Sequence, residues 1–228
     1  RDTDRSRGLG DVYKRQMVDA LMKMADKKLA ILNQRKRVTL PLSKLCIGMQ
    51  CGGSDAFSGV TANPSAGYAA DMLVKGGATV LFSEVTEVRD GVHYLAERCI
   101  SPEVRDKLAA EMRWDDNYLA EGEVDRSANP TPGNKKGGIS TLEDKSLGCT
   151  QKSGSAPVAD VLSYGQPVQT KGLNLLSAPG NDLVASTALA ASGAQIVLFT
   201  TGRGTPFASP VPTVKISSNT KLYENKKN

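Results

Sequence analysis

The sequence has few aromatic residues, few cysteines and no long apolar run. Of its 228 residues only 5% are aromatic, and it has one histidine and four cysteines, namely Cys46, Cys51, Cys99 and Cys149. The cysteines are scattered without a CxxC pair, which argues against a disulfide framework or a zinc cluster. No apolar run approaches the roughly 18 residues of a membrane span. We therefore expect no membrane contact and a cytoplasmic protein.

The common nucleotide and hydrolase motifs are missing as well. The sequence contains no GxGxxG, GxxxxGK[ST], HExxH or GxSxG, so no nucleotide cofactor is predicted. The net charge is +5, but much of the excess lies near the ends, for example at Lys27, Lys28, Lys226 and Lys227. Mixed signs in the middle and the scarcity of aromatics favour anionic small molecules over nucleic acid as partners.

Apolar runs and helical periodicities alternate along most of the chain. This rhythm predicts an α/β fold of repeated βαβ units around a mostly parallel sheet, with glycine-rich loops at the strand ends. Residues 129–138 hold two prolines and three glycines, which favours an irregular loop. The expected strands are 45–49, 78–82, 172–177, 195–200 and 214–217, and the expected helices are 17–32, 64–75, 101–119, 139–153 and 183–192.

The chain divides into three parts by composition. Residues 1–16 are charged, lack apolar periodicity and lack the apolar core of a signal peptide, so we interpret them as a non-native leader. Residues 17–40 are expected to be a helix and linker from a truncated upstream region. Residues 41–228 are expected to form the α/β domain.

The segment 51–64 follows the first expected strand and has the composition of a ligand-binding loop. Gly52 and Gly53 let backbone N–H groups face an anion, while Ser54 and Asp55 supply a hydroxyl and a carboxylate. Cys51 is either a soft metal ligand or a buried structural thiol. We predict substrate contacts here, against the alternative of a plain turn between strand and helix.

Acidic residues follow the second expected strand. Glu84 and Glu87 are three residues apart at its end, and paired carboxylates suit proton transfer or the binding of Fe(II), Mg(II) or Mn(II). Both are candidate catalytic residues, and Glu84 is also a candidate metal ligand, against the alternative of a solvated acidic loop. His93 is a further catalytic candidate, with a surface or packing role as its alternative.

Two cations occupy glycine-rich segments. Arg203, between two glycines at a strand end, is expected to hold a substrate carboxylate with its guanidinium fork, or else to be a turn arginine. Lys135 is a candidate base if Lys136 and burial depress its pKa, and otherwise an ordinary surface lysine. Asn134 and Thr201 lie in the same segments and complete the predicted substrate contacts.

Four segments together resemble a known family. Residues 50–64, 83–87, 129–138 and 199–207 resemble, in the same order, motifs of the altronate and galactarate dehydratases of sugar-acid catabolism. The resemblance runs from about Pro41 to the end of the chain. Residues 138–148 (GISTLEDKSLG) and 173–184 (LNLLSAPGNDLV) are more similar to altronate dehydratase, and residues 83–90 (SEVTEVRD) to galactarate dehydratase.

The resemblance implies an Fe2+-dependent hydro-lyase that converts D-altronate to 2-keto-3-deoxy-D-gluconate, with D-galactarate as the alternative substrate. Its partner would be a small-molecule sugar acid, and a homo-oligomer is compatible with the sequence. Family members are longer, so residues 41–228 would be a catalytic domain incomplete at its C-terminus, inactive by itself. A non-catalytic anion-binding α/β module is the competing interpretation, which formation of a 2-keto-3-deoxy acid would exclude.

Overall fold

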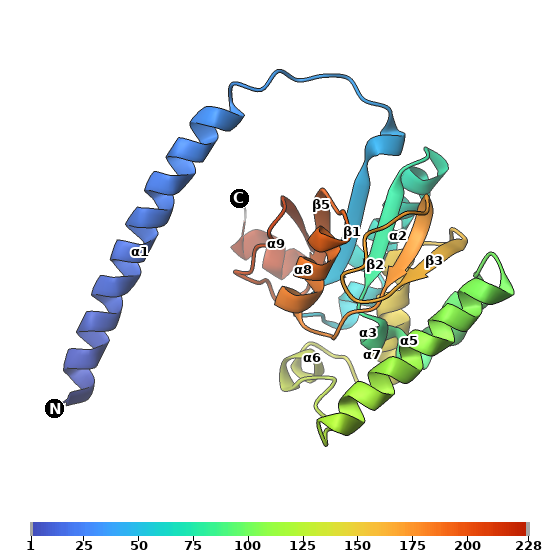
Figure 1. Ribbon diagram of the computed structural model, residues 1–228. Helices are drawn as coiled ribbons and strands as arrows, with labels where there is room; N and C mark the ends of the chain where they lie inside the picture. Colours follow the sequence, from blue (N-terminus) through green and yellow to red (C-terminus); the bar gives the residue numbers. More distant parts are fainter. Residues whose placement is uncertain (1, 227–228) are drawn as a thin grey trace. The chain divides into compact units, whose positions relative to one another are not determined.

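The computed structural model describes residues 2–226, which divide into two units between Leu40 and Pro41 (Figure 1). The first unit contains helix α1 (Asp2–Leu32), which includes the expected helix 17–32 and continues through residue 16. Every residue from 12 to 40 is exposed. The assignment of residues 1–16 to a leader stays a prediction. No helix within residues 2–226 combines the length and apolar character needed to cross a membrane.

The second unit is built on a six-stranded sheet in the order β3-β4-β2-β1-β5-β6. All five neighbouring pairs are parallel, which confirms the predicted α/β class. The strands are β1 (Cys46–Cys51), β2 (Thr79–Ser83), β3 (Val158–Leu162), β4 (Gly172–Leu176), β5 (Ile196–Thr201) and β6 (Thr213–Ser217).

Helices and short 3₁₀ turns connect the strands. The α-helices of this unit are α2 (Ala62–Lys75), α3 (Val85–Val88), α4 (Val92–Ala96), α5 (Pro102–Glu121), α6 (Pro132–Lys136), α7 (Leu142–Thr150), α8 (Asp182–Ala191) and α9 (Thr220–Asn225). The 3₁₀ turns are η1 (Leu42–Lys44), η2 (Ala56–Gly59), η3 (Arg89–Gly91) and η4 (Gln151–Ser153).

Side chains alternate across the sheet and form two cores. Ile47 and Met49 of β1 join the core that α2 and α5 cover, whereas Cys46 joins the core under α8. Successive side chains of β1 point to opposite faces of the sheet, and all of them are buried, as in a strand that is covered on both faces. A Cβ at Gly48 would lie 3.0 Å from Leu189 Cδ1, so this glycine lets α8 pack close to β1.

Three local expectations are corrected by the structure. Residues 129–138 are not wholly irregular, because Thr131 and Asn134 form a capping box that starts α6. Helix α2 begins at Ala62 rather than at Pro64. Strand β3 was not predicted, because it is an edge strand with partly exposed residues and a weak apolar pattern.

The topology determines where a ligand site is expected. Strand β1 lies between β2, its successor in the chain, and β5, which is reached much later. In open parallel sheets, ligands bind beyond the carboxyl ends of strands where the strand order reverses. The carboxyl ends of β1, β2 and β5 are therefore the part of this sheet to inspect for a site.

Candidate active site

Four acidic and thiol groups meet beyond the carboxyl ends of β1 and β2. Cys51 is the last residue of β1, Glu84 follows β2, Glu87 lies in α3 and Cys149 lies in α7, and all four are buried. Glu87 Oε2 is 3.4 Å from Cys51 Sγ and 3.3 Å from Cys149 Sγ. The two sulfurs are 3.7 Å apart, and Cys51 Sγ is 4.0 Å from Glu84 Oε2. We call these four residues the acid–thiol cluster.

Two buried lysines balance the charge of the cluster. Lys145 Nζ is 2.7 Å from Glu87 Oε1 and donates a 2.8 Å hydrogen bond to Asn129 Oδ1. Lys152 is only 1% exposed, and its Nζ lies 5.5 Å from the centroid of the Phe82 ring. Buried charges are costly unless they are paired, so the lysines and the acidic groups stabilise one another.

The two carboxyl groups have opposite pKa shifts. Burial raises the pKa of Glu84 well above its usual value, and the negative charges of Glu87 and Cys51 add to that shift. Burial also acts to raise the pKa of Glu87, but Lys145 and Lys152 outweigh it and lower the pKa to about 2. The shifts separate the two carboxyl groups: Glu84 holds its proton to higher pH, whereas Glu87 stays ionised, an arrangement that suits acid–base chemistry.

The pKa values of the two thiols are also shifted in opposite directions. The hydrogen bond with Cys149 lowers the pKa of Cys51 to about 7 in spite of burial. The same hydrogen bond raises the pKa of Cys149 well above its usual value, and burial raises it further. Because the thiolate is the form that binds metals, Cys51 is the better metal ligand of the two near neutral pH.

The backbone at Glu84 is strained. Its φ of 70° and ψ of 60° lie in the left-handed region, which non-glycine residues seldom adopt. Such conformations persist when the surrounding structure holds them, and they concentrate at functional sites. Here the strain accompanies the sharp turn from β2 into α3 and the burial of the Glu84 carboxyl group.

The shift at Glu87 predicts how the stability of the metal-free chain depends on pH. Its pKa falls from 4.5 to about 2 on folding, so its contribution to stability is present above pH 4.5 and is lost as the pH falls toward 2. The Glu87→Gln variant should lack this loss and show a flatter curve below pH 4.5. Urea unfolding in the presence of a chelator measures it. Parallel curves for variant and wild type would contradict the assignment.

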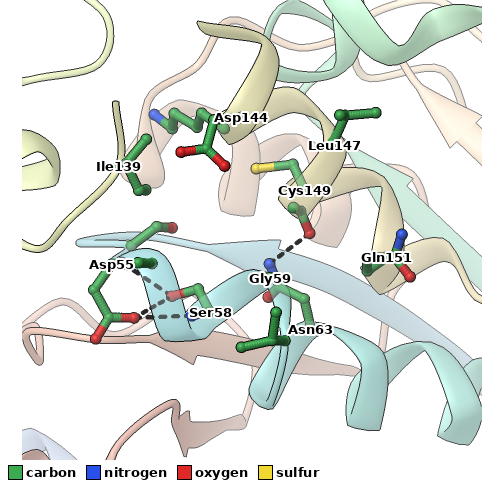
Figure 2. A pocket seen from close by; sticks show the side chains of 14 residues that line it. Asp55, Ser58, Gly59, Asn63, Ile139, Asp144, Leu147, Cys149 and Gln151 are labelled. Atoms are coloured by element: carbon green, nitrogen blue, oxygen red, sulfur yellow. Dashed lines mark hydrogen bonds between the residues drawn. The ribbon is translucent and has the colours of Figure 1, made fainter. Parts of the chain in front are cut away.

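A small cavity opens beside Cys149 of the cluster (Figure 2). It measures about 220 Å³ and lies between the segment 54–63 and α7. Lys145 and Cys149 line the cavity and also belong to the surroundings of Glu87. The other lining residues are Ser54, Asp55, Ala56, Ser58, Gly59, Val60, Asn63, Ile139, Asp144, Leu147, Gly148 and Gln151. A ligand in this cavity would contact the edge of the acid–thiol cluster.

The walls of the cavity are held by close backbone contact and by Asn63. A Cβ at Gly59 would lie 3.0 Å from Gly148 Cα, so glycine at both positions lets η2 approach α7. Asn63 Nδ2 donates a 2.8 Å hydrogen bond to the Gly148 carbonyl, and Asn63 Oδ1 accepts one of 2.6 Å from Thr200 Oγ1. These bonds link α2, α7 and β5 around the site.

The structure places the predicted residues Cys51, Glu84 and Glu87 together in the cluster, and it places Ser54 and Asp55 on the cavity wall. The Asp55 carboxylate is already engaged by local partners. It accepts hydrogen bonds from the backbone and hydroxyl of Ser58 and from Ser218 and Asn219. Asp55 therefore organises the cavity wall as the cap of η2.

The predicted pair Gly52 and Gly53 forms backbone hydrogen bonds with residues 200–203. The Gly52 N–H donates to the Thr200 carbonyl, which differs from the expectation that it faces an anion. The absent side chain of Gly52 leaves room for the carboxylate of Asp182. The Gly53 carbonyl accepts from the N–H groups of Gly202 and Arg203.

The remaining predicted residues lie outside the acid–thiol cluster and do not line the cavity. Asn134 is buried and donates to the Ser54 carbonyl at 2.8 Å, while Thr201 Oγ1 accepts from the Gly204 N–H. Arg203 is exposed, with its guanidinium against Gly133. Lys135 on α6 is exposed, so the burial that a base at this position required is not found. His93 on α4 is exposed, with its ring centroid 4.1 Å from that of Tyr94.

Three important residues were missed by the sequence reasoning. Cys149, Lys145 and Lys152 all come from α7 and the turn after it. Residues four apart share a helix face, so Lys145 and Cys149 on the expected helix 139–153 were a usable signal. Lys152 had no comparable signal, because burial of a lysine depends on charges contributed by other segments.

The donor set fits a metal ion. Donor atoms of Cys51, Glu87 and Cys149 all lie within 4.8 Å of one another, and all three residues are buried. Thiolates combined with a carboxylate suit a first-row transition metal such as Fe(II) or Zn(II) better than Mg(II), which prefers oxygen ligands. Within the described residues this is a candidate metal site of the chain.

An open parallel sheet with a buried acid–thiol cluster beside a polar cavity defines an α/β protein with the features of an enzyme site. The family model for "D-galactarate/Altronate dehydratase, C-terminal" matches residues 42–228. The chain belongs to this family.

Three characterised relatives show the extent of the similarity. The chain is 53% identical over 207 residues to galactarate dehydratase (L-threo-forming) of Escherichia coli K12 and 56% identical over 191 residues to altronate dehydratase of Bacillus subtilis 168. It is 48% identical over 197 residues to altronate dehydratase of Escherichia coli K12. These matches cover 84% to 90% of the chain but only 38% to 40% of each relative.

Proposed function

We propose that this chain supplies the acid–thiol part of the active site of a sugar-acid dehydratase, a hydro-lyase that converts D-altronate to 2-keto-3-deoxy-D-gluconate. The observation that carries the proposal is the cluster of Glu84, Glu87, Cys51 and Cys149 beside a cavity. The names of the relatives support the reaction class. A cytoplasmic location, a small sugar acid as partner and a homo-oligomeric state belong to the same proposal.

Lys145 is assigned as the anchor of the substrate carboxylate. The proton beside a carboxylate is weakly acidic, so its removal requires a cation that stabilises the negative charge on the enediolate oxygens. Lys145 lines the cavity, and its 2.7 Å ion pair with Glu87 fixes its position. An ammonium held in a buried site needs little reorganisation when charge develops nearby.

Glu84 is assigned as the proton reservoir for the departing hydroxide. Burial raises the pKa of its carboxyl group well above the usual value, which favours the protonated form that a general acid requires. The Glu84 Oε2 atom is 4.0 Å from Cys51 Sγ. Cys51, Glu87 and Cys149 are assigned as ligands of Fe2+, which as a Lewis acid would stabilise negative charge on a substrate oxygen.

The charges around the cavity favour altronate over galactarate. Among the residues that line the cavity, Lys145 is the cation and Asp55 and Asp144 are acidic. A single lysine suits altronate, which has one carboxylate. The second carboxylate of galactarate would lie near the acidic side chains of Asp55 and Asp144. The hydroxyl and amide groups of Ser54, Ser58 and Gln151 suit the hydroxyls of a hexonate.

A domain graft tests the proposed reaction. Residues 41–228 would replace the matching part of Bacillus subtilis altronate dehydratase, and 2-keto-3-deoxy acid formation would be measured with Fe2+. We expect turnover of D-altronate in excess of D-galactarate, no turnover by the chain alone, and loss of at least about 100-fold in the Glu87→Ala graft. That variant lacks a proposed Fe2+ ligand, and even partners of metal ligands are worth about 10-fold to 100-fold.

The controls separate a failed graft from a failed proposal. The circular dichroism of the graft should match that of the parent enzyme, and the parent should be active under the same conditions. A folded graft that forms no product from either acid would contradict the enzyme assignment and favour an anion-binding module. Turnover of galactarate alone would reverse the substrate order.

A further inference from the structure

The two thiols of the cluster form a close pair that could react with each other when no metal ion is bound. Cys51 and Cys149 are 98 positions apart in sequence, both are free, and their sulfur atoms are 3.7 Å apart. One lies at the end of a central strand and the other on α7. A disulfide requires a sulfur separation of about 2.05 Å, so the pair needs only a modest approach to form the bond.

A small oxidant can reach this pair through the cavity. Cys149 lines the cavity of about 220 Å³, and the Cys51 sulfur, which does not line it, is 3.7 Å from the Cys149 sulfur. The other two cysteines have different surroundings. Cys46 begins β1 and packs in the core under α8, and the Cys99 thiol contacts the Leu95 carbonyl at 3.5 Å. The geometry therefore singles out one pair among the four thiols.

We propose that Cys51 and Cys149 form a reversible disulfide on reaction with a peroxide, and that this oxidation closes the metal site. In the first step a thiolate of the pair attacks one peroxide oxygen, the O–O bond breaks, and a sulfenic acid and hydroxide form. In the second step the other thiol attacks the sulfenic sulfur, the S–S bond forms and water leaves. Overall, two thiols and one hydrogen peroxide give one disulfide and two waters.

The disulfide removes two of the three donors of the candidate metal site. Glu87 would remain paired with Lys145 and would have no thiolate beside it. Conversely, a metal ion bound by both thiolates would protect the two sulfurs from the peroxide. A dithiol reductant restores the thiols and with them the metal site. The disulfide part of this proposal does not depend on the dehydratase assignment, and the metal part depends only on the candidate metal site.

The test uses the whole chain after chelator treatment. The protein is exposed to hydrogen peroxide, denatured, alkylated with N-ethylmaleimide and analysed by intact mass and peptide mapping. We expect two of the four thiols to escape alkylation, a cross-linked peptide pair that contains Cys51 and Cys149, and full recovery after dithiothreitol. In the native protein, the thiolate absorption of bound Co2+ should be lost on oxidation and restored on reduction.

Matched variants sharpen the outcome. The Cys46→Ala/Cys99→Ala double variant should keep the cross-link, and Co2+ added before the peroxide should prevent it. Four alkylated thiols after peroxide treatment, or a cross-link through Cys46 or Cys99, would overturn the disulfide. A cross-linked protein that binds Co2+ as tightly as the reduced protein would overturn the closing of the metal site. Because the wild-type chain carries the main test, misfolding of a variant cannot hide the result.

Discussion

Replacement of Cys149 by serine is expected to lower the affinity of the chain for Co2+ or Fe2+ by more than about 100-fold, since even partners of metal ligands are worth 10-fold to 100-fold. Cys149 Sγ lies 3.3 Å from Glu87 Oε2 and 3.7 Å from Cys51 Sγ, so it completes the three-residue donor set. A serine hydroxyl is similar in size but is a poor substitute for a thiolate ligand. The affinity is measured by competition with a chromophoric chelator.

The control for this prediction is Cys99→Ser. Cys99 lies outside the cluster, so its replacement should leave the affinity for Co2+ unchanged and should keep the thiolate absorption band. Circular dichroism of both variants shows whether the fold is retained. Equal affinity of Cys149→Ser and wild type, in folded protein, would remove Cys149 from the metal site and leave the cluster as a structural charge network.

Replacement of Lys152 by methionine is expected to lower the free energy of unfolding by about 3–5 kcal/mol, the cost of leaving a buried charge uncompensated when its opposite charge is removed. Lys152 is 1% exposed. Although burial opposes its charged form, Cys51, Cys149 and the two glutamates raise its pKa. Methionine nearly preserves the volume but removes the positive charge that compensates the ionised groups of the cluster, of which Glu87 has the lowest pKa. Urea unfolding of the metal-free chain at neutral pH measures the loss.

Two further variants identify the cause of that loss. Lys75→Met, at an exposed position in the last turn of α2, should change stability by less than about 0.5 kcal/mol, as surface substitutions usually do. The double variant Lys152→Met/Glu87→Gln should lose less than the sum of the single variants, because it removes both charges. If the free energy of unfolding of Lys152→Met lies within about 1 kcal/mol of the wild-type value, the predicted role of Lys152 is wrong. Solvent or proton uptake would then neutralise the negative charge of the cluster.

Part of the candidate site was accessible from sequence for a topological reason. Cys51, Glu84 and Glu87 follow two apolar runs, and the carboxyl ends of parallel strands that lie side by side meet at one edge of the sheet. The residues chosen by chemical type alone behaved differently. His93, Lys135 and Arg203 are exposed and lie outside the cluster, because the chemical type of a side chain carries no information about which way its segment packs.

The sequence by itself determined the class of fold, the positions of five of the six strands and of helices α2, α5, α7 and α8 to within a few residues, and the family. These depend on local periodicity, on capping and turn residues and on contiguous motifs. Only the tertiary structure decided which polar groups are buried together. Cys149, Lys145 and Lys152 join Cys51 and the two glutamates because α7 packs against the end of the sheet. The charges and pKa values of the site arise from that contact, since burial and charge compensation depend on segments that are distant in the chain.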